Sequence, residues 1–211
     1  TIRDASLPVV RWVAAAPGGA ALDSEGKSGA LSMTMDLMLR GTQKKSRNVF
    51  SEKLEGLGSS LTALGGNEIA LLRGLSLKRN LTETLGLMRE AVLEPAFDET
   101  EFETLRDETI DDIVSIPDDD GGLCGVFWRR ALYGDHPLAR MPSGEIPELL
   151  NLNLDDIKAM HRRVFLEGRL LWVFSGDLTP EDARAAVESI YSIDTPREYL
   201  QVATQEITVR Q

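Results

Sequence analysis

Short apolar runs bounded by glycine, proline or polar turn residues predict four strands along the chain. These runs cover residues 9–16, 61–64, 69–77 and 169–175. Gly65, Gly66 and Asn67 lie between the second and third runs, and this turn chemistry predicts a hairpin. The fourth run contains LLWVF without a polar interruption, so we expect a strand that is buried on both faces.

Apolar residues spaced three or four positions apart predict the helices. The predicted helices cover residues 29–42, 47–57, 81–93, 98–116, 123–132, 157–165 and 179–191. Residues that can cap a helix begin or precede four of them, namely Ser46, Asp98, Asn153 and Thr179. An acidic stretch at 118–122 is expected to be a solvated loop, because it lacks the alternation of a calcium-binding loop.

The order of these elements predicts the fold class. Early hairpin strands followed by several helices are typical of an α+β domain, in which helices pack on one face of a mostly antiparallel sheet. A length of 211 residues with 42% apolar content suits one domain with a sizeable core. We expect this core to span about residues 9–191, with a tail or linker at 192–211 that includes a strand-like piece at 205–209. The amino terminus resembles a cut from a longer chain, so we expect a second domain of the parent protein to lie outside this one.

Charge and cysteine content narrow the function classes. The formal net charge of −11 argues against binding to nucleic acid or to anionic membranes. No apolar run is long enough to span a bilayer, so we expect a soluble protein of the cytoplasm or periplasm. The single cysteine, Cys124, has no paired base nearby in the sequence, and we expect a small buried apolar residue rather than a nucleophile. A phosphate loop ending at GKS is excluded because Ala21 stands where glycine is required.

The predicted helix at 29–42 has the geometry of a metal-binding helix without the ligands. Leu31, Met35 and Met38 recur on one apolar face. Ser32 and Asp36 lie four residues apart and share another face. In an HxxEH helix, two histidines at this spacing hold zinc and the glutamate acts as the general base.

The segment EGKSGALSMTMDLMLRGTQKKS resembles the start of a domain of the insulinase/pitrilysin metallopeptidases, of the mitochondrial-processing-peptidase-like type. Family members typically have G-L-A-H-F-L-E-H-M-L-F-K-G-T at this place. Aligned without a gap, the first histidine falls on Ser32, the glutamate on Met35 and the second histidine on Asp36. The later segments WRRALYGDHP and DLTPEDARAAVESIY resemble further family motifs in the same order, so the resemblance covers about residues 9–191.

The resemblance also assigns the third zinc-ligand position, on a helix that here contains FETLRDETIDDI, to Asp112. Two carboxylates and a hydroxyl make a poor zinc site, although they suit a hard cation weakly. Met35 cannot act as a base. We therefore expect no catalytic residue, no metal and no cofactor here. His136 and His161 are too few for a three-histidine site, and we expect His161 to be a partly exposed helix residue.

The resemblance implies a LuxS/MPP-like metallohydrolase fold and a non-catalytic half of a peptidase. Such a half shapes the chamber and helps to bind a peptide for a zinc-bearing HxxEH subunit or a second domain, as in a heterodimer. The predicted edge-strand residues for peptide contact by β-augmentation are Leu61, Thr62, Ala63, Leu64 and Gly65. Two alternatives stay open, namely a scaffold subunit that has lost its protease role and an active metallopeptidase with unusual ligands. The family's arginine–tyrosine pair has no counterpart in this chain.

Overall fold

A computed structural model describes residues 1–134, 136–191 and 197–200, so the strand-like piece predicted at 205–209 lies outside the described residues. Its centre is a five-stranded sheet in the order β1-β7-β2-β6-β5. The strands are β1 (Ile2–Arg3), β2 (Val9–Pro17), β5 (Ser60–Gly65), β6 (Ile69–Leu77) and β7 (Leu171–Gly176). Neighbours pair antiparallel except β1 with β7, and a small ribbon joins β3 (Gly41–Thr42) to β4 (Lys45–Ser46).

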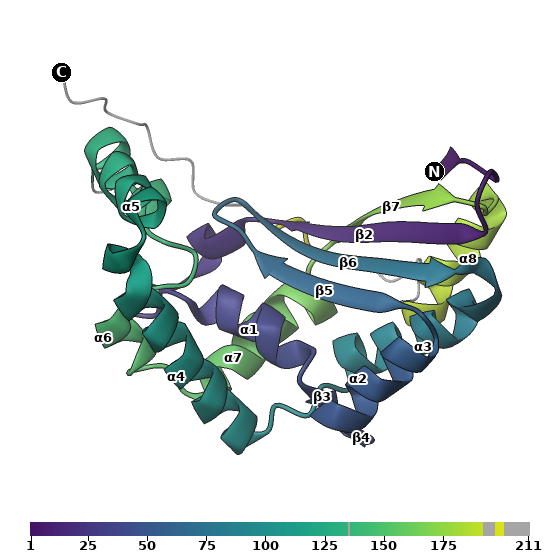
Figure 1. The fold of residues 1–211 in the computed structure, drawn as a ribbon, viewed down its shortest axis with the longest axis horizontal. Helices are drawn as coiled ribbons and strands as arrows, with labels where there is room; N and C mark the ends of the chain where they lie inside the picture. The colour runs from purple at the N-terminus through teal and green to yellow at the C-terminus, as the bar shows by residue number, and fades with distance from the viewer. Residues whose placement is uncertain (135, 192–196, 201–211) are drawn as a thin grey trace.

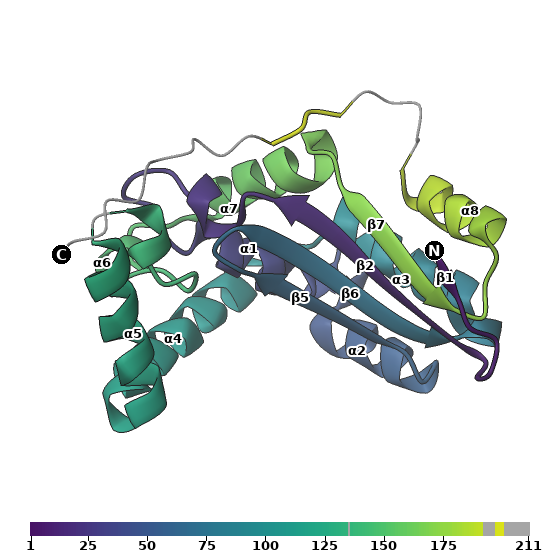
Figure 2. The same cartoon turned by 90° about the horizontal axis from the view of Figure 1, so that it is seen from above.

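The helices gather on one face of this sheet, which confirms the predicted α+β class (Figure 1). They are α1 (Ala30–Met38), α2 (Arg47–Gly56), α3 (Leu81–Leu93), α4 (Glu99–Ser115), α5 (Asp120–Tyr133), α6 (Ile146–Leu149), α7 (Leu154–His161) and α8 (Pro180–Ile190). Short 3₁₀ turns occur at Gly19–Leu22, Lys78–Asn80, Ile116–Asp118 and Pro137–Ala139, and a π-helical turn at Arg162–Glu167 extends α7. Seen from above, the strands lie in front and the helices behind them (Figure 2).

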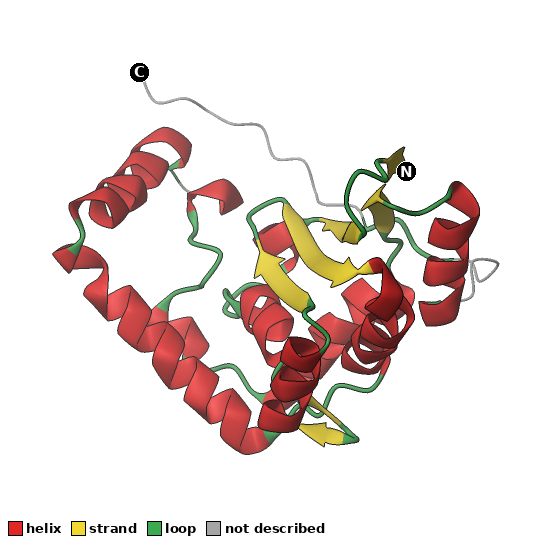
Figure 3. Ribbon diagram, turned by 45° about the vertical axis from the view of Figure 1, so that its right-hand side comes forward, coloured by secondary structure: helices red, strands yellow, loops and turns green. Residues whose placement is uncertain are grey.

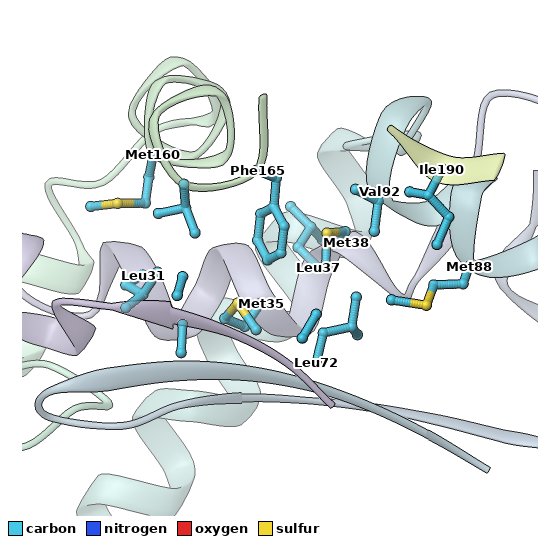
Figure 4. Close-up of a cluster of buried hydrophobic side chains, with 14 of the residues drawn as sticks. Leu31, Met35, Leu37, Met38, Leu72, Met88, Val92, Met160, Phe165 and Ile190 are labelled. Carbon is cyan, nitrogen blue, oxygen red and sulfur yellow. The ribbon is translucent and has the colours of Figure 1, made fainter. Parts of the chain in front are cut away.

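The core lies between the inner face of the sheet and the helices. Helix α1 is its centre, because seven of its nine residues are buried. Leu31, Met35 and Met38 of α1 lie between the sheet and the helices beyond, together with Leu72 of β6 (Figure 4). Complete burial of a side chain of this size contributes about 1.5–3 kcal/mol. The apolar face predicted for this helix is therefore the face that organises the fold.

Helix starts follow the predicted caps in three cases. The Asp98 carboxylate accepts hydrogen bonds from the backbone N–H groups of Thr100 and Glu101. Asn153 and Thr179 each form a reciprocal capping box with an aspartate three residues later. Ser46 stands at the start of α2, but its side chain makes no capping hydrogen bond.

Four expectations were wrong, and three of the errors concern burial, which depends on long-range packing. Strand β7 is not buried on both faces, because Leu171 and Val173 point to the open side of the sheet and are exposed. Cys124 is exposed, since α5 has no buried residue. His161 is buried, not partly exposed, because it packs in the core against two phenylalanines. Asp119 caps α5, which starts at Asp120, so three of the five residues of the predicted acidic loop lie in this helix.

Candidate functional site

Two of the four degenerate positions meet in one pocket. Asp36 of α1 and Asp112 of α4 both line a pocket of about 360 Å³, and strand β5 forms its third wall. The other lining residues are Leu39, Arg40, Leu61, Thr62, Ala63, Leu105, Glu108 and Thr109. Three of the five predicted strand residues, Leu61, Thr62 and Ala63, therefore border the same space as the two carboxylates.

Ser32 and Met35, the other two degenerate positions, do not line this pocket. Met35 is completely buried in the core and contributes no polar atom to the pocket (Figure 4). Ser32 lies against the end of β5, because a Cβ atom added to Gly65 would come within 2.9 Å of the Cα atom of Ser32. Such an approach requires glycine at position 65. The contact brings the polar face of α1 next to the end of the strand.

Strand β5 is the edge of the sheet. It pairs with β6 on one side, and no described strand pairs with its other side. The Gly66 N–H donates to the Ile69 carbonyl over 2.9 Å and so marks a hydrogen-bonded pair. Hydrogen-bonded and non-bonded pairs alternate along an antiparallel ladder, so the backbone N–H and C=O groups of Leu61, Ala63 and Gly65 point to the free edge.

Arg40 places a fixed positive charge in the pocket wall. Its guanidinium hydrogen-bonds to Glu108 and lies 3.5 Å from the Glu101 carboxylate. Packing around the Asp36 carboxylate removes part of its hydration and raises its pKa to about 6, while the charge of Arg40 opposes this shift. The side chain of Asp36 is nevertheless open to solvent at the pocket mouth. The pocket thus offers one carboxylate, that of Asp36, whose charge changes near pH 6.

The residues at these positions do not fit zinc. A hydroxyl and two carboxylates lack the imidazole or thiolate donors that zinc prefers. Arg40 also places a cation in the wall that a metal ion would face. Within the described residues, no three His, Cys, Asp or Glu side chains gather in a way that could hold a metal ion. Met35 offers no proton acceptor where the family has its general base.

Hydrogen bonds from outside the helix, which the sequence did not reveal, hold the start of α1 in place. The Asp23 carboxylate accepts hydrogen bonds from the N–H groups of Gly29 and Leu31 at 2.8 and 2.9 Å. Burial raises the pKa of Asp23 to about 6, and these two hydrogen bonds counteract the shift. The Ser28 N–H donates to Glu148 over 2.6 Å, so the helix start is also tied to α6. These hydrogen bonds to Asp23 and Glu148 fix the start of α1 and therefore the positions of Ser32 and Asp36.

Arg40 could have been found in the sequence, because it follows Asp36 by four residues, a spacing at which opposite charges meet on a helix. Asp23 gave no such signal, since its partners depend on a loop that returns to the helix start. Within the described part of the chain, no helix is both long and apolar enough to cross a membrane.

The chain is similar in sequence to several curated proteins. No protein-family model matches the chain. An uncharacterised zinc protease of Mycobacterium leprae is 23% identical over 188 residues, which is 88% of this chain and 41% of that protein. The non-peptidase homolog YmxG of Helicobacter pylori is 23% identical over 161 residues, which is 76% of this chain and 37% of that protein. The chain thus spans about two fifths of the length of the curated relatives it matches.

Solved structures share the fold. A peptidase M16 inactive domain from Pseudomonas fluorescens superposes with a TM-score of 0.83 at 22% identity, over 90% of this chain and 46% of that one. The first half of the periplasmic protease PqqL from Escherichia coli gives a TM-score of 0.78 at 15% identity, over 94% of this chain and 44% of that one. The chain thus shares its fold with a peptidase M16 inactive domain, and it is similar in sequence to proteins named zinc protease and non-peptidase homolog.

Proposed function

We propose that this chain is the non-catalytic half of a peptidase and that it binds an extended peptide along the free edge of β5. The partner that would supply zinc chemistry is an HxxEH-bearing subunit or a second domain of the same protein. One observation carries the proposal: the free edge of the sheet borders a pocket in which Asp36 and Asp112 stand at family zinc positions without forming a zinc site.

In this proposal, backbone hydrogen bonds along the free edge of β5 supply the affinity for the peptide. The outward N–H and C=O groups of Leu61, Ala63 and Gly65 form a row that can pair with an added strand. Side chains of an added strand alternate between its two faces, so every second one would point toward the side of the sheet where the pocket lies. Asp36 would then offer a carboxylate to the side chains that point into the pocket.

The non-catalytic part of the proposal is supported by the relatives. One matched protein is named a non-peptidase homolog and one solved neighbour an inactive domain. An active metallopeptidase with unusual ligands would need a base at position 35, and Met35 is an apolar core residue. A scaffold subunit would leave the edge of β5 unused, so peptide binding separates that alternative from ours.

The sharpest test uses two substitutions at one residue. Ala63→Pro removes an N–H group that points to the free edge, and it leaves the β6 ladder intact because that N–H does not pair with β6. Ala63→Val adds similar bulk and keeps the N–H, so it is the matched control. The probe is fluorescein-labelled, reduced and carboxymethylated α-lactalbumin, an unfolded polypeptide, and binding is followed by fluorescence anisotropy.

We expect Ala63→Pro to weaken binding about tenfold and Ala63→Val to stay within about threefold of the wild type. Circular dichroism of both variants checks that the fold is retained. Equal binding by Ala63→Pro and wild type would rule out augmentation at β5. No binding by the wild type, even with its zinc-bearing partner present, would favour the scaffold.

A further inference from the structure

Helix α5 carries an exposed apolar face. It stands off from the sheet, beyond the end of α4, and none of its residues is buried (Figures 1 and 3). Phe127 and Trp128 are each 65% exposed. Cys124 and Ala131 are exposed too, and they lie three or four residues from both aromatic residues, so the four side chains share one face of the helix. We call this face, formed by Cys124, Phe127, Trp128 and Ala131, the α5 stripe.

The two ends of the α5 stripe carry opposite charges. Asp120 lies at its start and Arg130 near its end, and both residues are exposed. Arg130 lies 3.6 Å from Glu145, but its side chain is 66% exposed and its guanidinium has further N–H donors. At 100° per residue, the acid and the base fall on the same flank of the stripe, about 15 Å apart along the helix axis.

An antiparallel pair of α5 helices matches these charges. In a two-fold pair centred on residue 125, Asp120 of each copy lies level with Arg130 of the other, and both are on the same flank. A parallel pair would instead bring the two Asp120 side chains together, and likewise the two Arg130 side chains. Like charges oppose association, so the charge pattern favours the antiparallel pair.

Glycines give the indole ring of Trp128 room in such a pair. Gly121 and Gly125 lie on the same flank of α5 as Trp128, and Trp128 lies level with residue 122 of the other copy, between these two glycines. A Cβ atom added to Gly125 would have no neighbouring atom within 4 Å, so packing within the chain does not require glycine there. Glycine is a poor residue inside a helix, and the close approach of a second helix explains its presence.

We propose that α5 is a self-association surface, on which the α5 stripes of two copies of this protein pair antiparallel and Asp120 of each copy pairs with Arg130 of the other. One short helix gives a small interface, so we expect a transient dimer with a dissociation constant of about 10 μM or higher. This inference does not rest on peptide binding at β5.

The first test is sedimentation velocity of the full-length protein at concentrations from about 1 μM to about 1 mM. At 0.15 M ionic strength the Debye length is about 8 Å, so the general repulsion between chains of net charge −11 is screened. We expect a dimer that grows with concentration. Trp128→Ala should weaken it at least about tenfold. Leu7→Ala, which removes a side chain that is 66% exposed between β1 and β2, is the control and should change it less than about twofold.

Charge reversal tests the pairing itself. Asp120→Arg and Arg130→Asp each place like charges opposite one another in the antiparallel pair, so each should weaken the dimer about tenfold. The double variant restores opposite charges and should return to within about threefold of the wild type. Circular dichroism checks that all three variants keep the fold. A contact with any different protein would not be restored by the double reversal.

Disulfide formation tests the centre of the pair. Cys124 lies one residue from the two-fold axis, so its Cα atoms in the two copies are about 3 Å apart along the helix axis, within reach of a disulfide. Oxidation with copper phenanthroline should cross-link the wild type and not Cys124→Ser. In the Cys124→Ser background, Ala131→Cys places the two thiols about 18 Å apart along the axis, so it should not cross-link.

Several results would overturn the proposal. The protein would stay monomeric at about 1 mM, or its dimer would persist unchanged in Trp128→Ala. Failure of the double reversal to restore the dimer would exclude the Asp120–Arg130 pairing. Cross-linking through Ala131→Cys would indicate a parallel pair and exclude the antiparallel one.

Discussion

Helices α1 and α5 were both predicted from the spacing of their apolar residues, but they differ in what they bury. Seven of the nine residues of α1 are buried, whereas none of the fourteen residues of α5 is. Helix α1 lies under the sheet between α4 and α7, but α5 extends from the end of α4 away from the sheet (Figure 3). Phe127 and Trp128 of α5 are consequently exposed. Periodicity predicts that a helix forms, and the neighbouring elements decide what it buries.

The largest effect should come from the centre of α1. Met35→Ala removes a completely buried side chain, so we expect the free energy of unfolding to fall by about 2–5 kcal/mol. Met35→Leu keeps most of the volume and should cost less than about 1.5 kcal/mol. Urea denaturation measures both. A loss below 1 kcal/mol for Met35→Ala would show that α1 is not the centre of the core; that threshold is about the mean effect of any substitution.

The second effect on stability should come from His161, a buried titratable residue beside α1. The Nε2 atom of His161 lies 2.7 Å from the Val92 carbonyl, and the ring packs on Phe97 and Phe165. Burial lowers the pKa of His161, although the hydrogen bond to Val92 opposes the shift. Between the folded and unfolded pKa values the unfolded chain binds more protons, so stability is lost as the pH falls below about 6.5.

The variant His161→Gln tests the direction of this pH dependence of stability. Glutamine can still donate to the Val92 carbonyl, but it does not titrate in this pH range. We expect the variant to be less stable than wild type at pH 8 because ring packing is lost, with a difference that narrows at pH 5. Thermal melts at the two pH values measure the change. A difference that widens toward pH 5 would contradict a buried neutral histidine.

Local signals in the sequence predicted the elements, and long-range contacts explain what it missed. The bounds of α3 and the β5–β6 hairpin followed from Pro95 and the turn at Gly65-Gly66-Asn67. His161 was placed wrongly because its partner Val92 lies 69 residues away. Ser32 and Asp36 were found by spacing, whereas the close approach of Gly65 to Ser32 depends on tertiary structure.

A smaller effect should come from the cap of α4, the helix that carries Asp112 to the pocket. Asp98→Ala removes two hydrogen bonds to backbone N–H groups, so we expect a loss of about 1 kcal/mol. Asp107→Ala on the exposed middle of the same helix is the matched control and should change little, since alanine is a good helix former. Urea denaturation measures the free energy of unfolding of both variants. Equal losses would show that the Asp98 cap does not stabilise α4.

The smallest effect should come from α5. Phe127→Ala removes an aromatic ring that is 65% exposed, so little area returns to water and no cavity forms. We expect the free energy of unfolding to change by less than about 0.5 kcal/mol, although a phenylalanine in the core would cost about 3–5 kcal/mol. Phe102→Ala in α4 is the matched control, because that ring is buried. Similar losses for the two phenylalanines would mean that α5 packs against the body in solution. A clear separation would leave α5 as a helix held by its backbone and its Asp119 cap, with its aromatic side chains free for contact with another protein.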